Sequence, residues 1–585
     1  MDEQQRKLAE ELFATSAKCG FAKGFYLGAF NGQNVFPYPQ ISAEEKTKTD
    51  AFLVKVTDFA ENQIDGDAID RQASIPDSVI QGLADLGVLG MTIPPEYGGL
   101  GMSQYAYCRV AEVISRKCAS TALFLNAHQS IGLKALLLFG TETQKQKWLP
   151  FLAKGKYLAA FSLTEPTAGS DASGIQTRAI YDKDKKVWLL TGNKQWTTNG
   201  AIADVLTVMA RTEIDTPQGK QDKITAFLVS PKMPGFKVTA AALEKVGMRG
   251  SKTANLSFTD LEVPEENILG PLGGGLRVCL TVLDFGRTTF GATCLGAARY
   301  LVQRAIEHAK TRYQFNRPLA SFSLVKQKIA TMSCLIYAME STTYLTAGFI
   351  DHHVEDFMLE SAILKVFASD ALWAILYDTM QIFGGRSFFT DQPFERMMRD
   401  ARLNMIGEGS NEVMRAFIGA IGMRDVGAQL KSSLDAIMHP IDRFSTLQSS
   451  ITHWASRITP PNVPLISPEL QNEAIILGKK IRTFGIAVTK LLIYHREEII
   501  ENQLQLNRIA TSAIALYTAS AVLSRIDADL NSTKERTSLL LDDLAIAKLY
   551  CTQAFRTIDM ELSAINNNCD AEIEALSDQL TGQIK

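Results

Sequence analysis

The sequence predicts a mainly helical protein with one central β-domain, because its hydrophobic patterning changes along the chain. Helical spacing covers about 47–151, short strand-like runs fill about 155–270, and long helical stretches follow. At 585 residues the chain is too long for one hydrophobic core, and about 150 residues per domain predicts three or four domains. The predicted units are an N-terminal extension and four domains, with bounds 1–46, 47–154, 155–272, 273–426 and 427–585.

The first helical region is predicted from apolar residues that recur at helical spacing. Val79, Leu83 and Leu86 lie at i, i+4 and i+7, which places them on one face of a helix. The segment TIPPEYGGLG (92–101) interrupts this pattern as a loop rich in Pro and Gly. We therefore expect helices on both sides of this loop.

The central region is predicted to be a β-domain from its short, bounded runs. Residues 179–192, AIYDKDKKVWLLTG, form two runs around a charged turn. DVLTVMA (204–210), ITAFLVS (224–230) and FKVTA (236–240) are rich in β-branched or aromatic residues and are bounded by Pro, Gly or Asp. These features are typical of strands.

The region after Gly275 is predicted to be a helical bundle. Long stretches with few breakers cover 276–313, 323–350 and 356–383, and long helices with short links indicate a bundle. A Pro-rich joint, 457–470, precedes three further helices. These are predicted at about 470–500, 503–530 and 535–567.

Composition and spacing exclude several classes of protein and site. The formal net charge of −3, without a dense Lys/Arg stripe, argues against nucleic-acid binding. The eight cysteines form no CxxC pair and the seven histidines form no HExxH, so we expect packed, reduced thiols and no metal site. The acidic start lacks the apolar core of a signal peptide, and no run of about 18 apolar residues predicts a membrane span.

The segment NMIGEGSNEVMR (404–415) places one carboxylate, Glu408, between Gly407 and Gly409, just before a helical pattern that begins at Ser410. One interpretation is a loop followed by a helix cap. The other is a catalytic base presented where glycines keep the surroundings free of side chains. This segment alone does not decide between them.

Two segments of the central region could bind a polar, aromatic ligand. FSLTEPTAGSDASG (161–174) offers hydroxyls and bare backbone N–H groups at Thr164, Gly169 and Ser170, although an ordinary Ser/Thr/Gly turn would look the same. In NKQWTTNGAIAD (193–204), Trp196 and Thr198 would share one side of a strand, although a packed core Trp is the commoner explanation. The chain has no Walker-type or nicotinamide-binding glycine motif.

Six segments occur in an order that resembles one family of flavoproteins. The segments are FSLTEPTAGSD, KQWTTNG, VGMRGSKTANLSF, KTRYQFNRPL, QIFGGRSF and IGEGSNEVMR. With them the chain resembles the acyl-CoA dehydrogenase family over about residues 45 to 425, and FNGQNVFPYP (30–39) and the helical tail resemble its very-long-chain branch. The resemblance implies an N-terminal helical domain, a middle β-domain, a C-terminal four-helix bundle and an extra C-terminal helical domain.

The resemblance implies an FAD-dependent long- or very-long-chain acyl-CoA dehydrogenase of fatty acid β-oxidation. Glu408 matches the catalytic base, which abstracts the α-proton while the β-hydride passes to flavin N5 and trans-2-enoyl-CoA forms. This chemistry needs an aligned base and hydrogen bonds that strengthen as the thioester oxygen becomes enolate-like. The backbone N–H of Glu408 and a flavin ribityl hydroxyl are the expected donors. Some family members carry the base at the position of Gly286, before Arg287, where glycine cannot take a proton.

The resemblance also assigns the FAD contacts. Trp196 would stack near the isoalloxazine ring, and Thr198 would bond to its N5 side. Residues from the ends of two bundle helices would reach the FAD of a neighbouring subunit, which implies at least a dimer. The residues assigned to FAD are Phe161, Leu163, Thr164, Gly169, Ser170, Trp196, Thr198, Arg312, Gln314, Phe315, Gln381, Gly384, Gly385, Ser410 and Glu412.

The residues assigned to the acyl-CoA substrate are Ser170, Leu283, Arg287, Gly407 and Gly409. Four positions depart from the family pattern. Gly407 replaces an aromatic residue, Ser410 a Thr, Ser387 a glycine, and Lys326 a glutamine that meets the adenine end of FAD. Gly132 and Ala135 are both small, as in the long-chain branch, and imply a long acyl tunnel, slightly shortened by the methyl group of Ala135.

The expected partners are long-chain acyl-CoA, electron-transfer flavoprotein as electron acceptor, and a second copy of the chain. The alternative is a scaffold or assembly protein with the same fold and weak or no activity. Glu408, Arg287 and Trp196 favour the enzyme, whereas Gly407 and GGRSF would suit the scaffold. An acyl-CoA oxidase is disfavoured by the match to dehydrogenase motifs.

The location of the protein is predicted from the start of the chain and from segment 434–458. The acidic start favours a bacterial cytoplasm over a mitochondrial matrix. The apolar face of 434–458 is expected to pack on the bundle, with a peripheral helix at a membrane surface as the alternative.

Overall fold

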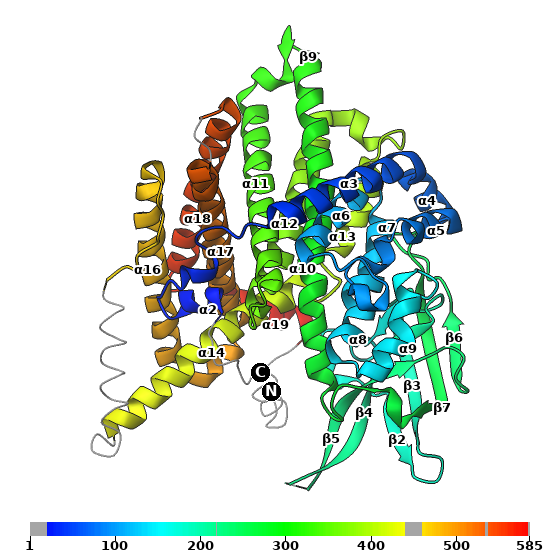
Figure 1. Cartoon of the computed structure of the whole chain (residues 1–585). Coiled ribbons are helices and arrows are strands. Elements are labelled where there is room, and N and C mark those ends of the chain that lie inside the picture. The colour runs from blue at the N-terminus through cyan, green and yellow to red at the C-terminus, as the bar shows by residue number, and fades with distance from the viewer. Residues whose placement is uncertain (1–19, 218, 439–458, 533–535, 583–585) are drawn as a thin grey trace.

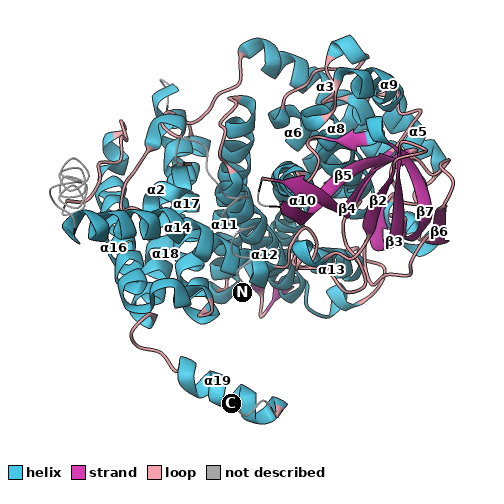
Figure 2. Cartoon of the chain, turned by 90° about the horizontal axis from the view of Figure 1, so that it is seen from below, coloured by secondary structure: helices cyan, strands magenta, loops and turns pink. Residues whose placement is uncertain are grey.

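The structure is a computed structural model that describes residues 20–217, 219–438, 459–532 and 536–582 (Figure 1). Helical layers flank a single large sheet, so the predicted fold class is confirmed. Figure 2 shows the sheet on one side of α10 and the C-terminal helices on the other. The long helix α10 (Gly275–Thr311) is therefore the element that both halves of the molecule share.

In the N-terminal helical domain, several helices begin at capping side chains. Ser42, Ser103 and Thr141 each accept a backbone N–H three residues ahead, which satisfies groups that a helix start leaves open. A π-helical stretch, Ala127–Gly132, joins two of the helices. The helices are α3 (Ala43–Gln63), α4 (Gly66–Gln72), α5 (Asp77–Asp85), α6 (Gln104–Lys117), α7 (Ala119–Asn126), α8 (Leu133–Phe139) and α9 (Glu142–Ala153).

The middle domain is one sheet in the order β6-β7-β3-β2-β4-β5-β8, with β1 paired in parallel to β4. The strands expected within 179–240 are present, and the sequence analysis missed β1, β7 and β8. The strands are β1 (Ala159–Ser162), β2 (Arg178–Asp182), β3 (Val187–Thr198), β4 (Val205–Thr216), β5 (Gly219–Val229), β6 (Phe236–Ala240), β7 (Thr253–Pro264) and β8 (Ile268–Leu269).

The bundle follows the predicted helices closely. Besides α10, it contains α11 (Ser323–Asp351), α12 (Met358–Phe383), α13 (Phe394–Leu403) and α14 (Asn411–Met438). A small hairpin, β9 (Tyr313–Gln314) with β10 (Arg317–Pro318), stands at the far end of α10 and α11 (Figure 1). The predicted domain boundary between 426 and 427 falls inside the continuous helix α14.

The C-terminal extension shares a core with the bundle. It contains α16 (Gln471–His495), α17 (Gln503–Ser532), α18 (Ser538–Ala564) and α19 (Asp570–Thr581). One apolar cluster includes buried residues from α10, α11, α12, α14 and α16–α18. In Figure 2, α19 lies apart from the body. The expected roles of 434–458 stay predictions, because 439–458 lie outside the described residues.

The segment 20–39 also joins this core, although it was predicted to belong to an N-terminal extension. Its helix α2 (Phe21–Tyr26) is buried along its whole length. The Tyr26 hydroxyl donates to the carbonyl of Ile418 at 2.8 Å, and the Ala22 N–H donates to Glu360 at 2.8 Å. The chain start therefore ties α12 and α14 together.

Two helical segments have the length and hydropathy of membrane spans, which the sequence analysis did not predict. They are Ala119–Phe139 and Gln503–Ser532, and 67% and 89% of their most apolar windows are buried within the fold. Burial of this extent is also found in the core helices of globular proteins. Of the seven cysteines within the described residues, six are buried free thiols and Cys569 is exposed.

Candidate active site

Glu408 lies in the loop between α13 and α14, on a backbone that few side chains adopt. Its φ is +57°, and Gly409 follows with φ +99°. Non-glycine residues in this left-handed region are uncommon and carry a conformational cost. The Ser410 hydroxyl accepts the Val413 N–H at 3.4 Å and caps α14. The loop therefore combines a helix cap at Ser410 with a strained presentation of the carboxylate.

Lys365 of α12 holds this loop in place through hydrogen bonds. Its ammonium group donates to the Gly409 carbonyl at 2.6 Å and to Asn411 Oδ1 at 2.9 Å. Asn411 in turn donates to Asp370 at 2.7 Å. Burial lowers the pKa of Lys365 to about 8, although the negative charge of Glu408 opposes this shift. The ammonium group thus contributes positive charge close to the candidate base.

The Glu408 carboxyl group has one bonded and one open oxygen. Oε1 accepts a hydrogen bond from Asn126 Nδ2 of α7 at 2.8 Å. Oε2 is buried and has no hydrogen-bond partner within the described residues. Burial raises the pKa of Glu408 to about 7, opposed by Arg287, Lys365 and the Asn126 hydrogen bond. A carboxylate with a pKa near neutrality and a bare oxygen can accept a proton from a bound molecule.

Arg287 supports the same loop and is only 4% exposed. Its Nε donates to the backbone carbonyl of Glu408 at 3.4 Å, and its Nη1 pairs with Asp284 at 3.1 Å. The Ser361 hydroxyl also donates to Asp284 at 2.8 Å. Burial raises the pKa of Asp284 to about 6, an effect that Arg287 opposes. In this structure Arg287 therefore contacts the loop that carries the base.

The lack of a side chain at Gly286 leaves room for the Glu408 carboxyl group. A Cβ atom at this position of α10 would lie 2.8 Å from Glu408 Oε2 and 2.9 Å from Ile131 Cγ2. Any larger residue would displace the carboxyl group or the π-helical stretch. The position that carries the base in some members of the resembled family thus faces the same point in space.

Replacing Gly286 with alanine is expected to lower the rate of flavin reduction by acyl-CoA about a hundredfold, the usual cost of misplacing a reacting group by about 1 Å. Stopped-flow absorbance measures this rate. The matched control is Gly427→Ala on α14, where a Cβ would meet its nearest atom at 3.9 Å. Equal rates for the two variants would show that Gly286 does not position Glu408.

The helix α7 connects the base to the middle domain. The Asn199 amide, just after β3, donates to the Phe124 carbonyl at 3.0 Å, two residues before the Asn126 that holds Glu408. One turn further on, His128 Nδ1 accepts the Ala159 N–H at 3.0 Å, so its Nε2 donates to the Leu89 carbonyl at 3.0 Å. Residues of two predicted site segments, 193–204 and 404–415, therefore form hydrogen bonds to the last turn of α7.

Trp196 and Thr198, which are assigned to the flavin ring, lie at the end of β3. A register irregularity between Lys194 and Thr197, with φ +58° at Trp196, turns the indole outward, where it is 62% exposed. Thr198 is half-buried, whereas Thr197 between them is buried and bonds to Ser162 at 2.8 Å. Phe161, Leu163 and Leu283 belong to one apolar cluster, with Leu283 contributed by α10.

A buried ion pair holds the 161–174 segment on β3. Lys194 Nζ lies 2.6 Å from Glu165 Oε1, and their side chains are 0% and 3% exposed. Lys194 also donates to the Leu163 carbonyl at 3.0 Å, and Glu165 accepts the Gln176 N–H at 2.5 Å and the Thr177 N–H at 3.1 Å. The pair therefore fixes the backbone next to Thr164, which is half-buried, while Gly169 and Ser170 are exposed.

A second group of assigned residues lies elsewhere. Arg312, Gln314 and Phe315 sit at the β9–β10 hairpin, where Phe315 is 88% exposed. The C-terminal end of α12, with Gln381, Gly384 and Gly385, lies beside the end of α10, because His308 and Phe383 stack with ring centroids 4.1 Å apart. These residues form one exposed cluster that no described contact links to Glu408.

The residues that depart from the family pattern differ in their burial and contacts. Ser387 is buried, and its hydroxyl donates within its own turn to the carbonyls of Met380 at 3.0 Å and Gly384 at 2.8 Å. The hydroxyl is therefore bonded to the backbone of its own turn, including that of Gly384. A Cβ at Gly407 would meet nothing closer than 3.6 Å. Lys326 and Glu412 are exposed.

Asn126, Lys194 and Lys365 are the residues that sequence reasoning missed. Asn126 and Lys365 lie in segments that read as ordinary helices, whereas Lys194 lies in the candidate segment 193–204, in which only Trp196 and Thr198 were singled out. Lysine and asparagine are mostly exposed in proteins, so for Asn126 and Lys365 the position within an apolar run was the available signal.

Family profiles match most of the chain. The acyl-CoA dehydrogenase N-terminal, middle and C-terminal domains match residues 46–156, 160–261 and 273–423, and the "ACAD9/ACADV, C-terminal domain" matches 468–584.

Individual relatives agree with these profiles over nearly the whole length. The chain is 35% identical to a mitochondrial very long-chain specific acyl-CoA dehydrogenase of Bos taurus, covering 95% of this chain and 85% of that protein. It is 32% identical to the probable acyl-CoA dehydrogenase FadE10 of Mycobacterium tuberculosis, covering 100% and 92%. The structure of an acyl-CoA dehydrogenase complexed with FAD from Bacillus anthracis superimposes with a TM-score of 0.79 at 26% identity, covering 97% and 96%.

Proposed function

The chain belongs to the acyl-CoA dehydrogenase family, and from this premise we propose that it converts long- and very-long-chain acyl-CoA to trans-2-enoyl-CoA with Glu408 as the base. The observation that carries the proposal is the open Oε2 of a buried carboxyl group whose pKa is raised to about 7. An oxygen in this state is suited to take the weakly acidic proton beside a thioester carbonyl.

FAD is the cofactor of the family, and the residues assigned to it fit such a group. Gly169, Gly384 and Gly385 have no atom within 4 Å of the place a Cβ would occupy. Trp196 offers an exposed indole, and aromatic rings stack readily on one another. When bound, FAD supplies the acceptor for the hydride that leaves the β-carbon.

The protein residues have separate tasks in this reaction. Glu408 Oε2 takes the α-proton, while Asn126 holds Oε1. The Glu408 backbone N–H would donate to the thioester oxygen, which gains negative charge as the proton leaves. Lys365 and Arg287 hold the loop by its carbonyl groups. The apolar residues Leu163 and Leu283 limit access of water.

The rate of flavin reduction is expected to depend on pH with a midpoint near 7. Glu408 acts as a base only when it is ionised, and its pKa is raised to about 7 by burial. The rate should therefore be about half its maximum near pH 7, fall as the pH is lowered, and become constant about one to two pH units above the pKa. Anaerobic stopped-flow mixing with palmitoyl-CoA between pH 5.5 and 8.5 measures this curve. A rate that is constant over this range would contradict the assignment.

We further propose a homodimer, electron-transfer flavoprotein as the acceptor, and a bacterial cytoplasmic location with peripheral membrane contact. The dimer is supported by the exposed cluster at Arg312, Gln314, Phe315 and Gln381, because these residues are free to contact the FAD of a second subunit. In the crystallographic or solution dimer, this cluster should lie at the subunit boundary.

The function is tested by anaerobic mixing of the FAD-loaded protein with palmitoyl-CoA. Bleaching of the oxidised-flavin absorbance together with formation of trans-2-hexadecenoyl-CoA would support the proposal. A flavin-loaded protein that no acyl-CoA from C4 to C20 reduces would overturn it in favour of a scaffold role.

A further inference from the structure

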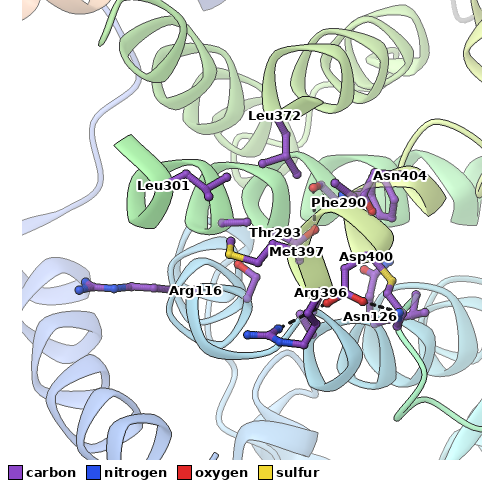
Figure 3. Close-up of a pocket in the computed structure, with 17 residues that line it drawn as sticks. Arg116, Asn126, Phe290, Thr293, Leu301, Leu372, Arg396, Met397, Asp400 and Asn404 are labelled. Carbon is purple, nitrogen blue, oxygen red and sulfur yellow. Dashed lines mark hydrogen bonds and ion pairs between the residues drawn. The ribbon is translucent and has the colours of Figure 1, made fainter. Parts of the chain in front are cut away.

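A small, partly open cavity lies next to Asn126, which bonds the candidate base, among α6, α7, α10, α12 and α13 (Figure 3). Its volume is about 30 Å³, which is enough for at least one water molecule. Figure 3 places the exposed Arg116 at one side of it and Asn126 and Asn404 at the other. Ala122, Phe290 and Leu372 provide apolar parts of the wall.

Two buried amide oxygens in this cavity wall are unsatisfied. Asn126 and Asn404 are 1% and 5% exposed, and the Oδ1 atoms of both have no partner within the described residues. A buried polar atom without a hydrogen bond costs about 1–3 kcal/mol. Both oxygens are acceptors, so the group that satisfies them must carry a donor hydrogen. Water in the adjoining cavity meets this requirement.

The orientation of the Asn126 amide matters for catalysis. A carboxylate accepts hydrogen bonds only, so Nδ2 of Asn126 must face Glu408 Oε1, at 2.8 Å, and Oδ1 must point away from it. A cavity water that donates to Oδ1 would stabilise this orientation over the flipped one. The flipped amide would present its oxygen to the carboxylate and repel it.

We propose that Asn126 and a cavity water form a positioning unit that holds Glu408 Oε1, keeps Oε2 free for the substrate proton, and sets the pH at which the base works. This inference rests on the proposed function. Asn126 is a positioning residue here, because it acts through Glu408 and not on the substrate.

The charged groups around the carboxyl define what Asn126 contributes. Arg287 from α10 and Lys365 from α12 favour the ionised form of Glu408, and so does the Asn126 hydrogen bond from α7. Burial by the surrounding elements opposes all three. Removal of the Asn126 donor alone should therefore leave the two cations in place and shift the balance toward the protonated acid.

The test compares the pH dependence of flavin reduction in wild type and Asn126→Leu, which keeps the side-chain size but not the donor. Hydrogen bonds to charged groups contribute about 1.5–3 kcal/mol, so the midpoint should move up by about one pH unit or more. At pH 6 the rate should fall about tenfold relative to wild type. A second variant, Asn126→Asp, places a like charge beside Glu408 and should shift the midpoint further upward.

Thr293→Val is the matched control. Thr293 lines the same cavity, but its hydroxyl donates within α10 to the Phe290 carbonyl at 2.8 Å. Its midpoint should equal that of wild type. Deuterium exchange at C2 of palmitoyl-CoA in D₂O gives a second readout, which should show the same displaced midpoint in Asn126→Leu without depending on hydride transfer.

Several outcomes would overturn the inference while leaving the proposed function intact. The inference fails if the wild-type flavin is bleached normally but a folded Asn126→Leu or Asn126→Asp variant shows the same pH midpoint of flavin reduction as wild type. Another is an altered acyl-length preference without a pH shift, which would assign the cavity to the acyl chain. A crystal structure with no water bonded to Asn126 Oδ1 would remove the water from the unit. Failure of wild type to bleach would instead refute the proposed function.

Discussion

In the Glu408→Gln variant, the rate of flavin reduction by palmitoyl-CoA should be at least about a thousandfold lower than in wild type, a loss within the range that a general base contributes. The amide has the same size as the carboxylate and can still accept the Asn126 hydrogen bond through its carbonyl. It cannot take the α-proton, because a primary amide is not a base near pH 7. The variant should therefore bind FAD and acyl-CoA normally, which absorbance and a binding titration measure.

The control for this substitution is Glu355→Gln, which removes an exposed carboxylate near the start of α12. It should keep the wild-type rate. If Glu408→Gln retained more than about a tenth of the wild-type rate, another group would have to be the base. Asp284, which carries the other buried carboxyl group next to Arg287, would then be the next residue to test.

Lys194→Met is expected to destabilise the middle domain and to release FAD. The substitution leaves Glu165 as a buried carboxylate without its cation, and breaking a buried pair from one side costs about 3–5 kcal/mol. The Gln176 and Thr177 N–H groups remain, but they cannot neutralise the charge. Thermal unfolding should occur at a clearly lower temperature than in wild type, and the purified protein should contain less FAD.

Two further variants separate this effect from lost packing. The double variant Lys194→Met/Glu165→Gln removes the unpaired charge, so it should recover part of the stability. Lys185→Met removes an exposed pair with Glu262, at 2.7 Å on the same sheet, and exposed pairs contribute little to stability. A single Lys194→Met variant as stable as Lys185→Met would show that the buried pair does not hold the segment.

The fold was predictable wherever one periodic pattern continued for many residues. The helix expected at 323–350 extends over Ser323–Asp351 in the structure, because its apolar spacing is uninterrupted. By contrast, β1 is only four residues, AAFS, and buried throughout, so it carries no alternation to detect. The strand β7 contains Asp260 and Glu262 near its end, which masked its pattern.

The site was predictable only as separate segments. Motif order singled out Glu408, Trp196 and the glycines as candidates, but the contact between Asn126 and Glu408 joins residues 282 positions apart. No local pattern reports such a contact, because it depends on how α7 docks between the sheet and the bundle. The buried lysines were missed for a similar reason, since their partners come from other elements.

The most direct test of Glu408 as the base is deuterium incorporation at C2 of palmitoyl-CoA when FAD-loaded protein is incubated with it anaerobically in D₂O. Proton removal from C2 and its return label the remaining substrate, whether or not the hydride is transferred. Wild type is expected to label C2 and to bleach its flavin, whereas Glu408→Gln should do neither. Labelling by Glu408→Gln at a rate similar to wild type would contradict the assignment of Glu408 as the residue that removes the α-proton.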